Sequence, residues 1–399
     1  MTSSMNGPLD GYKILDVTSM ISGPFATMLL GDQGADVIKI EPPGIGDYVR
    51  AGGNRSGGLH ATFLNNNRNK RSITIDLKQD AGVDVLKRMA CDADVFVQNF
   101  RPGVVDRLGV GYDALKAENP NLVYVSISGF GEKGPYSHKP VYDPIIQALS
   151  GLASIQGGSD KARPRLVRTI LPDKLTAMTA FQAITAALLA RERTGQGQHV
   201  RLSMMDAVTQ FLWSSDMGGQ TFVGKEVSEQ RAASFIDLIY ETADGYMSVA
   251  VMSNAQWHAL CHAVGHPEWL EDDRFKTPAL RDLNINDRLE LIQSVLTGKT
   301  TQEWFDILDE AGVPCAPVLT RSEVLDHPQV TANDTLVEYD HPHAGRIRQA
   351  RHAARFEGTP ADALGAAPKL AEHTDEVLGD YGFDAEEIAA LRGRAVVGG

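Results

Sequence analysis

Short runs of β-branched residues alternate with helical stretches through the first third of the chain. Strand-like runs cover residues 14–18, 36–41, 72–77, 94–100 and 122–131, and helical patterning covers residues 24–35 and 82–93 between them. This alternation predicts an α/β fold with a parallel, doubly wound sheet and right-handed crossovers. Ligands of such sheets bind beyond the carboxyl ends of the strands, so we expect the functional site in the loops found there.

The pattern changes after about residue 220. Before that point, a strand is predicted at residues 199–204 and a helix from Asp206 to Trp213. Beyond it, residues 240–252 predict a β-hairpin that turns at Asp244-Gly245, and helical periodicity covers residues 255–265, 286–296 and 300–312. Residues 338–360 have an irregular strand and loop pattern, and residues 371–393 predict two terminal helices. We therefore expect a larger α/β domain and a smaller α+β domain.

Composition and charge restrict the class of protein. With 399 residues, of which 43% are hydrophobic, the chain is long enough for two sizeable cores. A net charge of −13 argues against a nucleic-acid or membrane partner, because both need a basic surface, and an anionic ligand would need a local basic pocket. The three cysteines form no CxxC, and we find neither a leader pattern nor an apolar run of bilayer length. These features predict a cytoplasmic protein with reduced thiols.

Asp173 is the strongest candidate for chemistry. It opens a small, apolar helix directly after Pro172, where the backbone N–H groups and the helix dipole favour an ionised carboxylate. A carboxylate held there can attack a carbonyl carbon. The alternative is a simple N-cap, which stabilises a helix by about 1 kcal/mol.

Several familiar motifs are absent or incomplete. The first βαβ unit lacks GxGxxG, since its turn reads Ser19-Met20-Ile21-Ser22-Gly23-Pro24, which argues against a dinucleotide. His258, His262 and His266 recur at four-residue spacing, but Gly265 and Pro267 end that helix and no carboxylate or cysteine completes a metal site. The sequence therefore predicts no bound metal.

Basic residues cluster near the predicted strand ends. Each is individually typical of a solvated surface charge, yet together they could form a phosphate pocket. They are Arg68, Lys70, Arg71, Lys78, Arg101, Arg107 and Lys139.

Six blocks in consistent order carry a family resemblance. They are PLDGYKILDVTSMISGPFATMLLGDQGADVIKIEPPGIGD, NRNKRSITIDLK, DVFVQNFRPGVVDRLG, SISGFGEKGPY, ARERTGQGQHVRLSMMDA and EHTDEVLGDYGF. Over nearly its whole length the chain resembles the family III coenzyme A transferases, which include formyl-CoA transferase and carnitine CoA-transferase. Asp173 falls where that family carries its nucleophilic aspartate.

The resemblance implies an architecture that periodicity does not. The large domain would be Rossmann-like and assembled from residues 1–218 together with a returning C-terminal segment, 329–399, while residues 219–328 would form the small domain. Two subunits would interlock as rings in an obligate homodimer. The active site would lie between the large domain and the partner's small domain.

The resemblance also implies a reaction. Asp173 would attack an acyl-CoA thioester to form an acyl-aspartyl anhydride, and an aspartyl-CoA thioester would then pass CoA to an acceptor carboxylic acid. CoA would be a substrate, and no other cofactor or metal would be needed. The implied CoA site consists of Met20, Ile21, Ser22, Ile75, Asp76, Leu77, Lys78, Asn99, Phe100, Arg101, Arg107, Lys139, Val141, Tyr142 and Asp143, with Lys78 and Arg107 expected to contact phosphates.

Three departures from the family pattern bear on the substrate. Pro42 stands where some members have an arginine, and Lys139 is displaced by one position, with Pro140 at the matching site. Residues 230–246 contain only Gly245 and so lack the glycine-run lid of the formyl-CoA enzyme. The missing lid favours an acyl group larger than formyl or oxalyl, while Pro42 implies another way of holding the adenosine end and the displacement of Lys139 weakens its assignment to the CoA site.

Two other functions stay open. The 2-methylacyl-CoA racemases resemble this chain, but they use a histidine–aspartate pair, and Tyr142 occupies the place of that histidine. Tyrosine is a poor proton acceptor near neutral pH. A CoA-binding protein without turnover is the other alternative.

The contacts to the donor and acceptor acids are expected to include residues of the small domain. The candidates are Tyr240, Tyr246 and Asn254, although packing or capping explains them as well.

Overall fold

The computed structural model describes residues 7–231, 238–361 and 365–398, which form two compact units. The larger unit comprises Met1–Ala153, Leu166–Ser214 and Asp334–Gly399, and the smaller comprises Ser154–Arg165 and Ser215–Asn333. The domain boundaries that we inferred from the sequence, at 218/219 and 328/329, stay predictions. Each unit is described below by itself.

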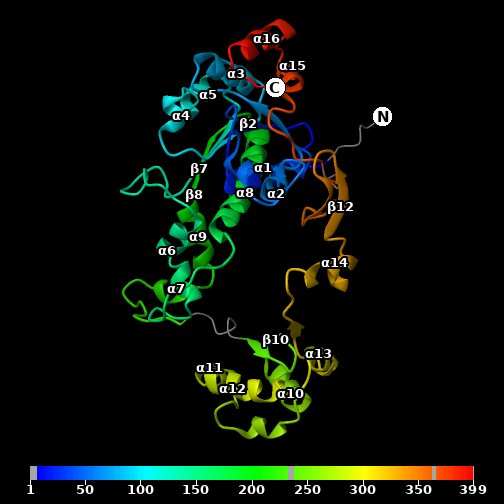
Figure 1. Cartoon of the computed structure of the whole chain (residues 1–399). Coiled ribbons are helices and arrows are strands. Elements are labelled where there is room, and N and C mark those ends of the chain that lie inside the picture. The colour runs from blue at the N-terminus through cyan, green and yellow to red at the C-terminus, as the bar shows by residue number, and fades with distance from the viewer. Residues whose placement is uncertain (1–6, 232–237, 362–364, 399) are drawn as a thin grey trace. The chain divides into compact units, whose positions relative to one another are not determined.

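A six-stranded sheet forms the centre of the larger unit (Figure 1). Its strands run in the order β5-β2-β1-β6-β7-β8, and every neighbouring pair is parallel. The α/β class with a parallel sheet is thus confirmed, and the strand order reverses between β1 and β6. The strands are β1 (Lys13–Asp16), β2 (Asp36–Glu41), β5 (Lys70–Thr74), β6 (Val95–Gln98), β7 (Val123–Ser128) and β8 (His199–Ser203).

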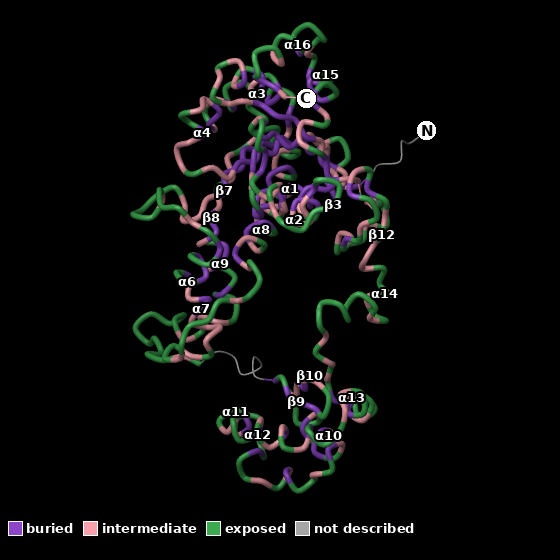
Figure 2. Tube along the Cα trace, in the orientation of Figure 1, coloured by how far each residue is buried: buried purple, intermediate pink, exposed green. Residues whose placement is uncertain are grey.

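Helices cover both faces of this sheet. Successive strand residues point to opposite sides, so Leu15 and Phe96 belong to one apolar cluster and Ile14 and Val95 to the other. The first cluster packs under α3 (Asp80–Cys91), α5 (Tyr112–Glu118), α15 (Thr374–Asp380) and α16 (Ala385–Gly393), and the second under α1 (Ser22–Gly31) and α8 (Leu171–Thr194). The central strands β1, β6 and β7 are buried along most of their length (Figure 2), which explains their largely apolar sequences, whereas the edge strand β8 is only partly buried.

The end of the chain packs against the edge of the sheet. The Asp76 amide donates to the Val396 carbonyl at 2.8 Å, and Ile75 forms a β-bridge with Val397. Before this, β12 (Leu336–His341) and β13 (Gly345–Ala350) pair as a regular antiparallel hairpin. That segment is more regular than the irregular strand and loop that its sequence predicts.

The smaller unit combines a short sheet with helices. Strands β9 (Ile239–Glu241), β10 (Tyr246–Val249) and β11 (Cys315–Pro317) are antiparallel, which confirms the predicted hairpin. Trp257, Trp269 and Trp304 anchor its apolar core. Its helices include α10 (Asn254–Ala263), α11 (Pro278–Leu283), α12 (Ile285–Leu296), α13 (Thr301–Glu310) and α14 (Pro328–Ala332).

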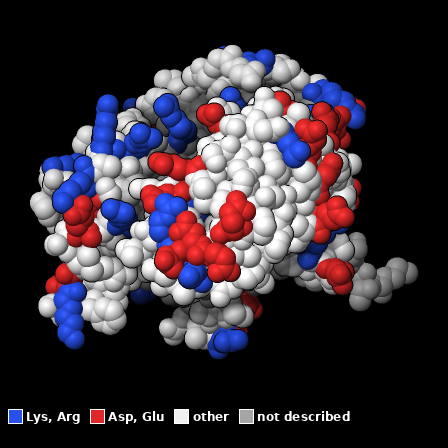
Figure 3. Space-filling model, turned by 90° about the horizontal axis from the view of Figure 1, so that it is seen from below, with Lys and Arg blue, Asp and Glu red and all other residues white. Residues whose placement is uncertain are grey.

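The described chain also contains four 3-10 helices, at Tyr48–Ala51, Gly218–Gln220, Pro267–Glu271 and Glu323–Asp326, and further strands and helices. These strands and helices are β3 (Arg55–Ser56), β4 (Leu59–His60), α2 (Ala61–Asn67), α4 (Val104–Arg107), α6 (Asp143–Leu149), α7 (Leu152–Gln156) and α9 (Met204–Trp213). None of the helices in the described ranges is both long and apolar enough to cross a bilayer. On the face drawn in Figure 3, acidic and basic side chains are interspersed.

Candidate active site

A cavity of about 260 Å³ opens at the carboxyl ends of β1, β6 and β7. The turn after β1 and the segment after β6 form one part of its wall, and residues of the loop from Ser137 to Tyr142 form another. Asp173 reaches it from the first turn of α8. Because the strand order reverses between β1 and β6, the cavity occupies the place where doubly wound sheets bind ligands.

Asp173 lies in the first turn of α8 and contacts the first residue of α1. It is the third residue of α8, which begins at Leu171 behind the N-cap residue Ile170, so the interpretation of Asp173 as an N-cap is wrong. Its Oδ1 accepts a hydrogen bond from the Ser22 hydroxyl, and the Ser22 backbone also donates to the carboxylate. Since Ser22 is the first residue of α1, the carboxylate meets the N-terminus of a second helix.

The environment raises the pKa of Asp173. Burial is the largest cause, and the nearby Asp143 carboxylate adds to it, while the hydrogen bonds from Ser22 oppose the shift. From the sequence we expected a lowered pKa, because the start of a helix favours the ionised carboxylate. Desolvation outweighs that effect here. A perturbed acid that lines a cavity is a candidate for catalysis.

The turn after β1 is held by side chains from other segments. Asn99 binds both backbone polar groups of Ser19. Its Oδ1 accepts from the Ser19 amide at 3.0 Å, and its Nδ2 donates to the Ser19 carbonyl at 2.8 Å. The Met20 amide donates to Asp47 Oδ1 at 3.1 Å. A Cβ on Gly23 would lie 2.3 Å from the Thr18 Cβ, so only glycine allows this approach. The chain thus makes a tight turn without GxGxxG.

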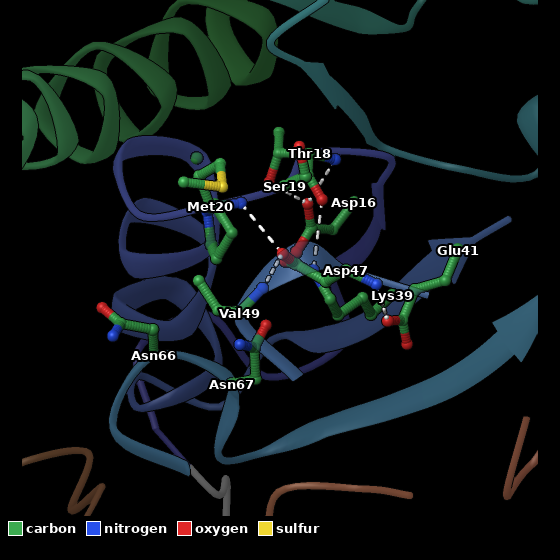
Figure 4. Close-up of polar contacts among 12 residues, drawn as sticks. Asp16, Thr18, Ser19, Met20, Lys39, Glu41, Asp47, Val49, Asn66 and Asn67 are labelled. Carbon is green, nitrogen blue, oxygen red and sulfur yellow. Dashed lines mark hydrogen bonds and ion pairs between the residues drawn. The ribbon is translucent and has the colours of Figure 1, made fainter. Parts of the chain in front are cut away.

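Buried charges lie beneath the turn (Figure 4). Lys39 pairs with Asp47 and Lys70 pairs with Asp16, each at 2.9 Å, and all four side chains are fully buried. Burial opposes the charge on Lys39, but Asp16 and Asp47 raise its pKa above the ordinary value. Removing one partner of a buried pair costs about 3–5 kcal/mol, because the other charge is left buried and unpaired.

A second cavity, of about 340 Å³, adjoins the first at the ends of β2 and β5. Ser19 and Phe100 line both cavities. The second is mostly apolar, and Lys78 is the basic residue among the described residues that line it. The two cavities therefore offer one continuous surface with polar and apolar parts.

Most of the predicted site residues line these two cavities. The first is lined by Met20, Ile21, Ser22, Asn99, Phe100, Arg101, Lys139, Val141, Tyr142 and Asp173, and the second by Ile75, Asp76, Leu77, Lys78 and Phe100. Asp143 instead lies behind the candidate nucleophile, buried, where its Oδ2 accepts from the Asp173 amide at 3.3 Å. Arg107 is exposed at the end of α4 and is not among the residues that line either cavity.

The basic residues near the strand ends divide into two groups. Arg68 forms a bidentate pair with Asp32 at 2.8 and 2.7 Å, and Lys70 pairs with Asp16, so the prediction of solvated surface charges is wrong for these two buried side chains. Arg71 is half-buried and pairs with three acids. Lys78, Arg101 and Lys139 are the members that line the cavities.

The other candidate residues lie in the smaller unit. His266 stacks on Trp269 at 4.7 Å and contacts Glu268, and no group of three or more His, Cys, Asp or Glu side chains in the described ranges is placed to hold a metal. Tyr240 is buried in the core, and Asn254 accepts from Arg281 at 2.6 Å. Tyr246 is exposed. Of the segment predicted to lack a glycine lid, residues 232–237 lie outside the described residues.

Sequence reasoning missed Asp47 and Lys39, which support the turn. The sequence did contain an indication of this pair. Lys39 lies between Ile38 and Ile40 in a run that predicts a buried strand, and a buried lysine needs a charged or polar partner. The partner itself carried no signal. Asp47 lies in a loop, where an aspartate has an ordinary explanation as a turn residue.

Comparisons with known proteins show the family of this chain. The sequence model of CoA-transferase family III matches residues 9–374. The chain is 33% identical to human succinyl-CoA:glutarate CoA-transferase over 99% of this chain and 91% of that protein, and 36% identical to Acetobacter aceti acetyl-CoA:oxalate CoA-transferase over 92% and 94%. A crystal structure of a CAIB/BAIF family protein from Brucella suis superimposes with a TM-score of 0.82 at 31% identity, covering 94% of this chain and all of that one. The protein belongs to CoA-transferase family III and is a CoA-transferase.

Proposed function

We propose that this enzyme moves CoA from an acyl-CoA to a carboxylic acid through covalent intermediates on Asp173. The observation that carries the proposal is the desolvated Asp173 carboxylate, which Ser22 holds by one oxygen at the wall of a cavity. Its other oxygen accepts no hydrogen bond from Ser22 Oγ and is the candidate to attack. The human and Acetobacter relatives are named for acyl-CoA donors and dicarboxylic acceptors, which supports this class of substrate.

The proposed reaction conserves the thioester energy. A carboxylate lone pair of Asp173 forms a C–O bond to the thioester carbon, and the C–S bond breaks with its electron pair on the departing CoA thiolate. The thiolate then attacks the aspartyl carbonyl of the anhydride, which releases the donor acid. The acceptor carboxylate attacks the aspartyl-CoA thioester, and the released thiolate attacks the new anhydride at the acceptor carbon. This gives the new acyl-CoA and free Asp173, with no metal, ATP or redox cofactor required.

CoA would occupy the two adjoining cavities. The apolar second cavity suits the adenine ring, and the cations that line the two cavities suit the phosphates: Lys78, Arg101 and Lys139. Arg107 would approach the phosphates from outside the cavity walls. Backbone N–H groups at the start of α1 could stabilise the oxyanion at each addition.

We also propose that the enzyme is the interlocked homodimer implied by the family resemblance. Large apolar side chains are about half exposed on helices of the larger unit, which a second copy would cover. They include Ile145 and Leu149 on α6, Met178 and Leu189 on α8, and Phe211 on α9. A cytoplasmic location stays a prediction from the sequence.

The racemase alternative is less well supported. It needs a histidine beside the reacting carbon, and no histidine is among the described residues that line the first cavity. Tyr142 lies there and is exposed. A binding protein without turnover would not need a desolvated carboxylate beside its ligand.

Asp173→Ala tests the proposal. We expect CoA transfer to fall by about a thousandfold or more while the dimer stays folded, because Asp173 is not the helix cap. The assay supplies succinyl-, acetyl- and formyl-CoA with a panel of acids that includes glutarate and oxalate. Undiminished transfer by the folded variant would overturn the proposal, and deuterium exchange at the α-carbon without transfer would favour a racemase.

A further inference from the structure

We propose that Asp47 is a positioning residue for the reaction: by accepting the Met20 amide, it holds the left-handed turn that sets Ser22 against Asp173. Asp47 does not contact Asp173, the candidate nucleophile. It acts on Asp173 only through the main chain of the turn from Met20 to Ser22. The proposal rests on the function proposed above, in which Asp173 attacks the thioester.

Met20 adopts a backbone conformation that needs support. Its φ is 71°, in the left-handed region where the Cβ of any residue other than glycine crowds the following carbonyl. Its side chain is 37% exposed, so packing alone does not fix it. The hydrogen bond from the Met20 amide to Asp47 Oδ1, at 3.1 Å, is the contact that holds this conformation.

Asp47 is rigid enough for this role. Its side chain is fully buried, its Oδ1 also accepts from the Val49 amide at 3.1 Å, and its Oδ2 pairs with Lys39 Nζ at 2.9 Å. Its own amide donates to Glu41 Oε2 at 2.9 Å, and Arg50 holds Glu41 by two hydrogen bonds of 2.7 Å. The carboxylate is therefore fixed from several directions, as Figure 4 shows for Lys39, Val49 and Met20.

The preceding residues of the turn are fixed as well. Lys39 Nζ donates to the Thr18 carbonyl at 3.1 Å, and Asn99 holds both backbone polar groups of Ser19. Rotation at Met20 is consequently the main freedom left between the end of β1 and the start of α1. Only Ile21 separates Met20 from Ser22, so a change at Met20 moves the hydroxyl that holds Asp173.

This arrangement predicts a larger effect on turnover than on binding. Although Asp47 borders the second cavity, its side chain is inaccessible to a ligand there. In Asp47→Ala we expect kcat to fall about tenfold, the rate equivalent of losing support for one left-handed residue, and the acyl-CoA KM to rise by a smaller factor, because the turn also lines the proposed CoA site. Asp47→Asn keeps an acceptor for the Met20 amide and should lose less. The acid limb of the Asp47→Ala profile should move to higher pH, because Ser22 no longer supports the carboxylate.

Met20 provides a matched pair of variants. Met20→Gly and Met20→Ala both remove the side chain, but only glycine adopts the left-handed conformation without strain. In the Asp47→Ala background, we expect Met20→Gly to give at least about threefold higher kcat than Met20→Ala. Equal kcat for the two double variants would overturn the proposal, as would an unchanged kcat and pH profile in Asp47→Ala.

Two further measurements keep the test decisive. If Asp47→Ala fails to fold because Lys39 is left unpaired, Lys39→Met/Asp47→Ala removes both charges and becomes the background for the same Met20 comparison. Asp173→Ala is assayed alongside. Retained transfer by Asp173→Ala would refute the proposed function, whereas abolished transfer with equal Met20 variants would refute only the role of Asp47.

Discussion

The two walls of the first cavity differ in how many contacts hold their residues in place. On the wall from Thr18 to Ser22, the buried Lys39 and Asp47 side chains and the half-buried Asn99 side chain bind the main chain of the turn. Ser22 contacts Asp173. On the wall from Ser137 to Tyr142, Lys139 and Tyr142 are exposed, and the Lys139 ammonium lies 3.4 Å from the centre of the Tyr136 ring. The difference indicates that the reacting group is fixed in advance, while the opposite wall can adapt to its ligand.

Gly23→Ala should damage the fixed wall most. The added Cβ would meet the Thr18 Cβ at 2.3 Å, so the start of α1 must move. We expect a loss of about 1–3 kcal/mol in the free energy of unfolding and about a hundredfold in kcat, because Ser22 leaves its position. Thermal unfolding and steady-state kinetics measure both effects.

Gly53→Ala is the matched control, since no atom lies within 4 Å of its added Cβ and its backbone is not left-handed. If Gly23→Ala turned over as fast as Gly53→Ala, the turn would not be the rigid wall described here.

Ser22→Ala should produce a smaller loss with a characteristic pH signature. Asp173 must be ionised to attack, so the rate falls as pH drops through its raised pKa. The hydrogen bonds from Ser22 lower that pKa, so removing the hydroxyl should move the acid limb of kcat/KM to higher pH and reduce kcat about tenfold.

Asp143→Asn should move the same limb to lower pH, because the Asp143 charge raises the pKa of Asp173. Parallel shifts in the two variants would show that the limb does not belong to Asp173.

Lys139→Ala tests the adaptable wall. Because Lys139 is exposed and lines the cavity, we expect the KM for acyl-CoA to rise about three- to tenfold with little change in kcat. Lys133→Ala, an exposed lysine of the same loop that does not line the cavity, is the control. A fall in kcat without a change in KM would mean that this wall also positions the reacting groups.

Arg107→Ala should have the smallest effect. Arg107 lies outside both cavities, so only a screened charge interaction with the CoA phosphates is expected. We expect CoA to bind about threefold more weakly at low salt, with the difference shrinking as salt is added. Calorimetric titration measures it, and equal affinity at low salt would remove Arg107 from the CoA site.

The sequence predicted the sheet better than the turn. The run Asp36–Glu41 matches β2 at both ends because β-branched residues fill most of its buried interior positions and Pro42 follows it directly. The left-handed Met20 could not be predicted, since methionine has no preference for that conformation and the residue that holds it, Asp47, lies far along the chain.

The candidate site, like the fold, was predicted from the sequence only in part. Most of the residues that the family resemblance implied, Asp173 among them, line the two cavities, although many other residues of the cavity walls were not predicted. The resemblance did not show that Asp143 lies behind Asp173, or that burial raises the pKa of Asp173. The first depends on the packing of α6 against α8 and the second on the burial of Asp173 beside segments far away in the sequence, and no local pattern encodes either.

Mass spectrometry of the enzyme during turnover tests the central claim most directly. After mixing with acyl-CoA and rapid quenching, the peptide that contains Asp173 should carry the mass of an acyl group or of CoA, and hydroxylamine should convert it to a hydroxamate at that residue. A fully active enzyme whose Asp173 peptide stays unmodified under these conditions, or whose adduct maps to another residue, would contradict the account.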